Sequence, residues 1–154
     1  DRADLVTAAS DSDVPTLQRI VEPRGRTVHF SSFADWGYDV YGYFLVARSD
    51  RLKLRQEEVR AFATATATAV EYAIRHPEEA ARIKARYSPA LDEVTALAHW
   101  KGSISAMNTA AVQHTGYGLA TQERLQRSID FVGRAFEFQT EVTPDDLYAQ
   151  GFLP

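Results

Sequence analysis

The side chains best suited to chemistry gather in two short segments of the chain. The first, residues 10–13, holds two serines and two aspartates and begins with Ser10 and Asp11. Its hydroxyls, carboxylates and backbone amides could bind a ligand that carries amines or hydroxyls. An apolar run precedes the segment and a helical pattern follows it, so Asp13 could instead cap that helix. Both roles remain open.

The second segment, residues 31–41, is dense in aromatic and small polar residues. Trp36, Tyr38 and Tyr41 offer flat rings that could stack on a planar ligand, and the Asp35 carboxylate could fix the orientation of that ligand. The alternative is that the Trp36 and Tyr41 rings serve only to pack a hinge.

Other reactive patterns are missing from the sequence. The absence of cysteine excludes a thiol nucleophile, a thiolate metal site and a disulfide. Residues 116–118 lack the third glycine and the preceding strand of a dinucleotide-binding loop, and no Gly-x-Ser-x-Gly elbow occurs. We therefore predict no catalytic residue, no metal and no cofactor. The histidines, which share no metal-ligand spacing, are His29, His76, His99 and His114.

Composition describes a folded chain that is large enough for one ordinary domain. Among the 154 residues, 45% are hydrophobic and 25% charged, which is typical of a globular protein. The net charge of −4 gives no basic surface, so nucleic acid is not expected as a partner. No apolar run approaches the roughly 18–20 residues of a membrane span.

The elements that must position the two segments change character along the chain. Residues 5–9, 27–30 and 41–47 are rich in β-formers and predict strands, with a helix beginning at Asp13 between the first two. After residue 50 the apolar spacing is helical throughout. Helices are expected to begin near Glu57, at Pro77, near Leu91, after Thr121 and after Thr143. The clearest apolar stripe is Leu125, Ile129, Val132 and Phe136.

Three strands are too few to form a sheet that covers so many apolar helix faces. We expect the missing strands to come from an absent amino-terminal half or from a partner chain. Uncovered apolar faces also predict self-association of the fragment.

Several runs of sequence occur in the order found in the type II solute-binding proteins of ABC importers, which the chain resembles. That group includes binding proteins for thiamine-pyrimidine precursors, alkanesulfonates, taurine and nitrate. The runs are FADWG at 33–37, VYG at 40–42, EVRAF at 58–62, AIRHPEEA at 73–80, RLQRSIDF at 124–131 and FLP at 152–154. One departure is Gln150-Gly151, where these proteins have a polar pair before the final FLP.

The resemblance implies an α/β architecture, as part of a two-lobed type II periplasmic-binding-protein fold whose amino-terminal half is missing. Residues 1–35 would belong to the second lobe. Residues 36–154 would form the return crossover and the helical completion of the first lobe.

The function implied is that of the substrate-binding component of an ABC importer, which captures a small polar or aromatic solute by lobe closure and makes or breaks no bond. Its partners would be the solute and the importer's membrane subunits. Its location would be periplasmic or extracytoplasmic, with or without a lipid anchor. The ligand-binding residues would be Ser10, Asp11, Asp35, Trp36, Tyr38 and Tyr41.

Two other functions remain open. The first is an enzyme of pyrimidine-precursor synthesis on the same fold. Such relatives carry a cysteine-rich motif and a lysine-bound cofactor, whereas this chain has no cysteine and its lysines lie outside the two segments. The second is a ligand-sensing domain of a signalling protein.

Overall fold

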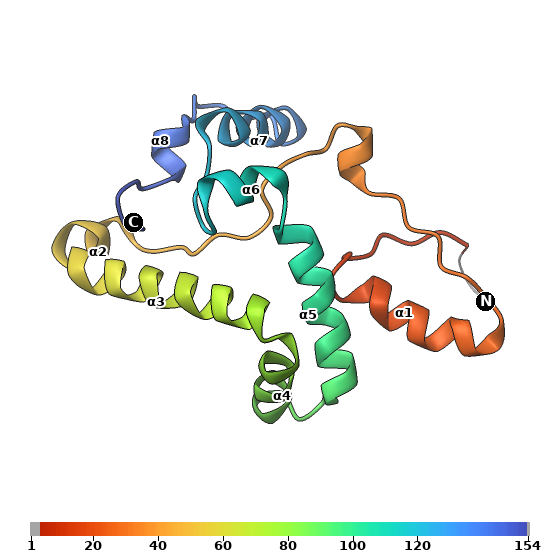
Figure 1. Cartoon of the computed structure of the whole chain (residues 1–154). Coiled ribbons are helices and arrows are strands. Elements are labelled where there is room, and N and C mark those ends of the chain that lie inside the picture. Colours follow the sequence, from red (N-terminus) through yellow and green to blue (C-terminus); the bar gives the residue numbers. More distant parts are fainter. Residues whose placement is uncertain (1–3, 154) are drawn as a thin grey trace. The chain divides into compact units, whose positions relative to one another are not determined.

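The computed structural model describes residues 4–153, apart from the side chains of residues 110, 111 and 115. The regular structure of these residues is helical (Figure 1). The chain divides into two units, which are described separately. Unit 1 comprises Asp1–Ser31 and Val70–Thr115, and unit 2 comprises Ser32–Ala69 and Gly116–Pro154. The predicted division into 1–35 and 36–154 stays a prediction. Pro154, the last residue of the FLP run, lies outside the described residues.

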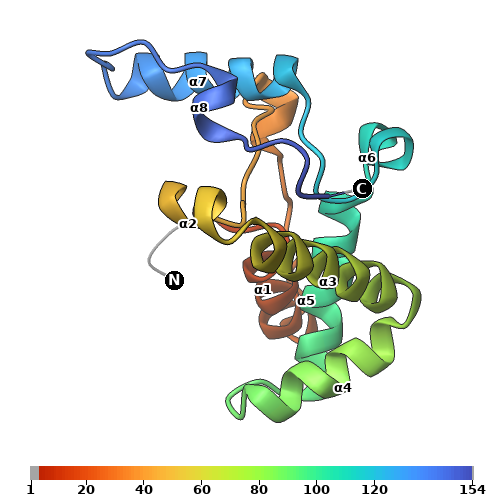
Figure 2. The ribbon, with the colours of Figure 1, turned by 90° about the vertical axis from the view of Figure 1, so that its left-hand side faces the viewer.

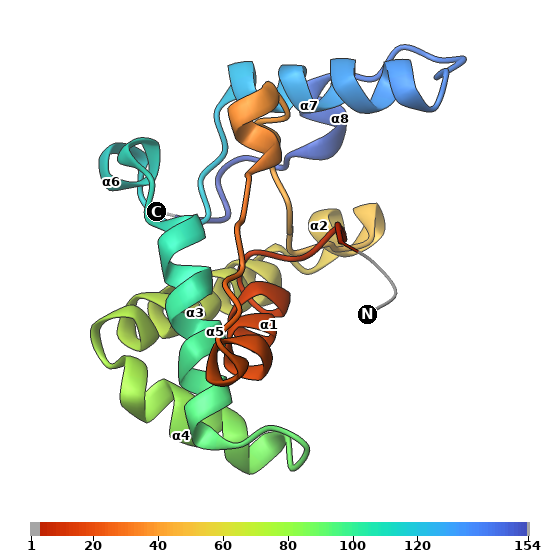
Figure 3. The same ribbon diagram turned by 90° about the vertical axis from the view of Figure 1, so that its right-hand side faces the viewer.

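Unit 1 is built around helix α5, and α1 and α4 pack against it (Figures 1 and 3). Its fully buried residues, Ala81 on α4 and Ala96 on α5, are small and let the two helices approach closely. The Thr16 hydroxyl on α1 lies 2.9 Å from His99 Nε2 on α5. The elements are α1 (Asp13–Val21), the 3₁₀ turn η1 (Glu22–Arg24), the end of α3 (Gln56–Arg75), α4 (Pro77–Tyr87), α5 (Glu93–Met107) and α6 (Ala110–Thr115).

Unit 2 is built around helix α7, and α8 packs against it (Figure 2). Leu125 and Ile129 of α7 are its buried apolar residues, as the apolar stripe predicted. Phe136, at the end of the same stripe, is exposed. The elements are the 3₁₀ turn η2 (Phe33–Trp36), α2 (Ser49–Leu54), the first part of α3, α7 (Gln122–Ala135) and α8 (Pro144–Leu147).

The expected strands are not formed. Residues 5–9, 27–30 and 41–47 have no regular structure, and no strand occurs anywhere in residues 4–153. A strand requires hydrogen bonds to a neighbouring strand, and these segments do not pair with one another. Their apolar side chains are uncovered, with Leu5 91% exposed and Tyr43 94% exposed. The structure of residues 4–153 therefore does not confirm the predicted α/β architecture.

The helix boundaries agree with the local sequence signals better than the predicted strands do. Pro77 begins α4, and Thr121 caps α7 by accepting a hydrogen bond from the Arg124 N–H. Thr143 is the N-cap of α8, where the Asp146 carboxylate accepts hydrogen bonds from the Thr143 N–H at 2.9 Å and from its hydroxyl at 2.7 Å. Helix α5 continues through Gly102 to Met107. No helix within residues 4–153 is both long and apolar enough to cross a membrane.

Candidate functional site

The loop before α1 is closed by hydrogen bonds between its two ends. The Asp13 carboxylate accepts a hydrogen bond from the Ala9 N–H at 2.9 Å, and the N–H groups of Asp13 and Val14 donate to the Ala9 carbonyl at 3.0 and 3.1 Å. The N-cap residue of α1 is Ser12. The prediction that Asp13 caps α1 is therefore wrong, because its carboxylate binds Ala9, on the other side of the loop.

The same loop lies directly on α5. A Cβ atom on Gly102 would stand 2.8 Å from the Asp11 Cα and 2.9 Å from its carbonyl oxygen, closer than side chains approach. Only glycine lets the backbone of the loop come this near the helix. The Asp11 carboxylate accepts hydrogen bonds from the hydroxyls of Ser12 and Ser103, each at 3.2 Å. Asp11 is thus anchored to unit 1.

Ser10 differs from Asp11 in having no such partner. It is exposed and forms no hydrogen bond with the described residues. The loop therefore holds Ser10 at the surface on a backbone fixed at both ends. A ligand role for Ser10 and Asp11 stays a prediction.

The second segment contains a well-defined turn, η2. The Ser32 hydroxyl accepts a hydrogen bond from the Ala34 N–H at 3.2 Å, and the turn ends at Gly37, whose φ of 92° favours glycine. The Tyr38 N–H closes the turn by donating to the Phe33 carbonyl at 3.0 Å. This geometry presents the side chains of Asp35 and Trp36 at the surface, and the Trp36 side chain is 81% exposed.

Tyr38 joins this turn to α7. Its ring centroid lies 4.4 Å from that of Phe131 and 6.1 Å from that of Phe33, both in edge-on arrangements. The three rings form an aromatic row that remains partly exposed. Such a row could contact the flat face of a ligand.

Tyr41 has intramolecular partners on several sides. The Arg124 guanidinium lies over its ring at 4.6 Å, and the Phe44 ring meets it edge-on at 5.7 Å. Its hydroxyl accepts a hydrogen bond from the Thr121 N–H at 3.0 Å, at the start of α7. Its own N–H donates to the Ser128 hydroxyl at 3.3 Å. Tyr41 therefore fixes its segment to α7, and its predicted contact with a ligand stays untested.

An ionic cluster beside Tyr41 was missed by sequence reasoning. The Asp39 carboxylate lies 2.5 Å from Arg124 and 3.7 Å from Arg127, and Arg127 also pairs with Glu123 at 2.8 Å. The Arg124 Nε atom is buried without a hydrogen-bond partner. The only sequence signal was the spacing of Arg124 and Arg127, which places both on one face of α7.

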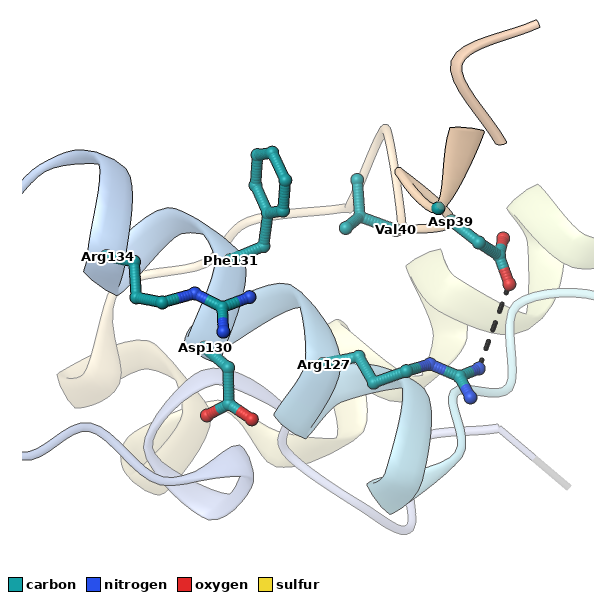
Figure 4. Close-up of a pocket in the computed structure, with 7 residues that line it drawn as sticks. Asp39, Val40, Arg127, Asp130, Phe131 and Arg134 are labelled. Atoms are coloured by element: carbon teal, nitrogen blue, oxygen red, sulfur yellow. Dashed lines mark ion pairs between the residues drawn. The ribbon is translucent and has the colours of Figure 1, made fainter. Parts of the chain in front are cut away.

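A shallow hollow of about 330 Å³ lies next to this cluster, within unit 2 (Figure 4). We call it the α7 hollow. Its lining comes from the segment after η2, through Gly37, Asp39 and Val40, and from α7, through Arg127, Asp130, Phe131 and Arg134.

A metal site is not evident in the described part of the chain, where no three His, Asp or Glu residues are grouped to hold an ion. Two of the histidines have structural contacts instead. His99 lies within hydrogen-bonding distance of Thr16, and the His76 ring stacks on Tyr72 with centroids 4.3 Å apart.

The six predicted ligand residues fall into two groups. Ser10 and Asp11 belong to unit 1, and the remaining four belong to unit 2. Within unit 2, η2 places Asp35 and Trp36 on one turn, and Tyr38 and Tyr41 both contact α7. The positions that sequence reasoning missed are the α7 side chains that Tyr38 and Tyr41 contact.

Comparison with known proteins identifies the family. A family model described as NMT1/THI5 like matches residues 1–80, slightly more than half of the chain. Neither a curated protein nor a solved structure matches. The matched residues include both predicted ligand segments, and the family is one of small-molecule-binding proteins with the type II periplasmic binding fold. The chain belongs to the NMT1/THI5-like family.

Proposed function

We propose that the chain is part of the substrate-binding component of an ABC importer, which captures a small polar or aromatic solute between two lobes and releases it unchanged. The observation that carries this proposal is the NMT1/THI5-like match over residues 1–80, which agrees with a solute-binding role. The further parts of the proposal rest on the geometry of the described residues.

The first of these is that the chain forms the carboxy-terminal half of a two-lobed protein. Residues 41–47 support it, because they are apolar at successive positions and pair with no strand in the described part of the chain. Tyr43 and Val46 are both more than 90% exposed. A strand that is apolar on both faces is typical of the interior of a parallel sheet covered on both sides. The neighbouring strands would come from residues outside this chain.

The second is the location of the solute. The loop that presents Ser10 is fixed at both ends, and η2 holds Trp36 on a rigid turn with its ring exposed. Rigid loops that carry a few polar groups and an exposed aromatic ring suit reversible binding, because little order is lost when the ligand arrives. Asp11, Asp35, Tyr38 and Tyr41 complete the proposed set.

The proposal includes a place in the cell and a partner. A substrate-binding component of an importer works outside the cytoplasmic membrane and delivers its solute to the importer's membrane subunits. The protein would therefore be periplasmic or otherwise extracytoplasmic. It would bind its solute without catalysis, since lobe closure requires no bond to form or break.

The test is a thermal-shift screen of the full-length parent protein against pyrimidines, alkanesulfonates and aromatic acids. A solute that binds the folded state raises the melting temperature in a concentration-dependent way. The variant Trp36→Ala should abolish this shift. It should leave the melting temperature without solute unchanged, because the ring is mostly exposed. No shift with any of the three classes would contradict the proposal.

A further inference from the structure

We infer that Arg124 is a positioning residue for solute binding, because it fixes the end of the second segment, residues 31–41, against α7. The inference rests on the proposed function, since it concerns how the same site reaches its affinity. Arg124 acts through Asp39 and Tyr41 and does not need to touch the solute. It is not among the six predicted ligand residues.

Arg124 holds the segment by two different side-chain contacts. Its guanidinium pairs with the Asp39 carboxylate at 2.5 Å and lies over the Tyr41 ring at 4.6 Å. A guanidinium is both flat and charged, so one group can pair with a carboxylate and also stack on a ring. The two restrained side chains are separated by a single residue, and together they restrain the backbone between them.

The backbone of Tyr41 is tied to the same part of α7. Its N–H donates to the Ser128 hydroxyl at 3.3 Å, and that hydroxyl donates to the Arg124 carbonyl at 2.8 Å. The Thr121 hydroxyl caps the helix by accepting a hydrogen bond from the Arg124 N–H at 3.4 Å. The Thr121 N–H donates to the Tyr41 hydroxyl at 3.0 Å. Arg124 therefore holds the segment from an anchored position at the start of the helix.

Arg127, which lies on the same face of α7, offers a comparison within the structure. It stands 3.7 Å from Asp39 (Figure 4), it also pairs with Glu123 at 2.8 Å, and its side chain is 52% exposed. The Arg124 side chain is only 22% exposed. Solvent and salt weaken an exposed ion pair more than a shielded one. The contact of Arg124 should therefore contribute more than that of Arg127 to holding the segment.

The restrained stretch directly follows the residues proposed to meet the solute. Asp35 and Trp36 lie on η2, and Tyr38 comes after the turn, one residue before Asp39. The Tyr38 ring packs edge-on against Phe131 of α7 at 4.4 Å. Binding groups that are held in place beforehand lose less order when a ligand arrives. Release of the segment from α7 should therefore weaken solute binding.

The first measurement needs no solute. The full-length parent protein is labelled with fluorotyrosine, and the fluorine resonance of Tyr38 is assigned by its loss in Tyr38→Phe. We expect Arg124→Gln to shift or broaden that resonance, because the Tyr38 ring loosens on α7 when its segment is released. The matched control, Arg127→Gln, removes the same charge from the same helix face and should leave the resonance unchanged.

The second measurement is calorimetric titration with cytosine, ethanesulfonate and benzoate, one probe from each class of the thermal-shift screen. Arg124→Gln should weaken binding of the probe by about tenfold, the cost of ordering one or two side chains on binding. Arg124→Lys should keep part of the affinity, because it keeps the charge opposite Asp39 but not the flat contact with Tyr41. Arg127→Gln should weaken binding by less than about twofold.

Two results would overturn the inference and leave the proposed function standing. One is an Arg124→Gln variant with unchanged affinity or an unchanged Tyr38 resonance. The other is an equal loss of affinity in Arg127→Gln, since the charge of the cluster would then matter and the contacts of Arg124 would not. If Arg124→Gln does not fold, Asp39→Asn must show the loss of affinity instead. A parent protein that binds none of the three probes contradicts both the inference and the proposed function.

Discussion

Replacing Gly102 with alanine tests whether the close contact between α5 and the loop of Ser10 and Asp11 governs the stability of unit 1. In an ordinary exposed helix, glycine to alanine stabilises by about 1 kcal/mol, because alanine restricts the unfolded chain and favours the helix. At Gly102 the added Cβ would stand 2.8 Å from the Asp11 Cα and 3.2 Å from its carbonyl carbon. Both are backbone atoms, so the loop must move as a whole.

The expected magnitude follows from these two opposing effects. Forcing a methyl group into a packed contact costs about 1–3 kcal/mol. Set against the helix-propensity gain of about 1 kcal/mol, this predicts a net loss of about 0–2 kcal/mol for Gly102→Ala. The matched control is Gly133→Ala on α7, where the nearest atom is the flexible Phe138 side chain at 3.4 Å. That variant should keep most of the gain, so the two should differ by about 1–3 kcal/mol.

The assay is urea unfolding followed by circular dichroism for both variants. The chain has two tryptophans, and Trp100 lies on α5 with its indole N–H donating to the Ala73 carbonyl at 2.8 Å. In a Trp36→Phe background the remaining fluorescence reports on unit 1 alone. An unfolding midpoint for Gly102→Ala equal to or above that of Gly133→Ala would refute the close contact.

Three further predictions concern single side chains. Leu125→Ala should lower the free energy of unfolding by about 2–5 kcal/mol, because Leu125 is fully buried, and urea denaturation measures this loss. The Thr143 hydroxyl and N–H lower the pKa of Asp146, so the stability that this carboxylate gives α8 is present above its unfolded pKa and is lost as pH falls through the lower folded pKa. The protection factor of the Thr143 amide, measured by hydrogen exchange and NMR, should therefore fall in acid, and Asp146→Asn should remove that pH dependence. Trp36→Ala should change the unfolding free energy by less than about 0.5 kcal/mol, and a larger loss in denaturation would show that the ring packs against the fold.

Helices could be predicted from the sequence where a cap or a proline marks their beginning. Pro77, Thr121 and Thr143 each mark a helix start in the structure. Helix α6, at residues 110–115, has no comparable signal and was not predicted. The strand at 41–47 was wrongly predicted because β-propensity describes a fit to neighbouring strands, and residues 4–153 form none.

The candidate site was predictable only in its local parts. Asp35 and Trp36 stand out because aromatic and acidic residues lie together in a short loop. The pairing of Asp39 with Arg124 joins residues 85 apart in sequence, and no local pattern indicates it. The contact of Gly102 with Asp11 was equally hidden, since a glycine within a helix can mark weakness or a close approach, and only packing distinguishes the two.

The unpaired segment at 41–47 has a consequence for how the chain behaves at high concentration. A short uncharged run with high β-propensity and free backbone groups is a template for strands of other molecules. The run is followed by Arg48 and Asp50, which form a 2.9 Å ion pair. Charges that flank such a run oppose the addition of further strands. Neutralising both residues should lower the concentration at which the chain precipitates, and a synthetic strand that covers the run should raise it.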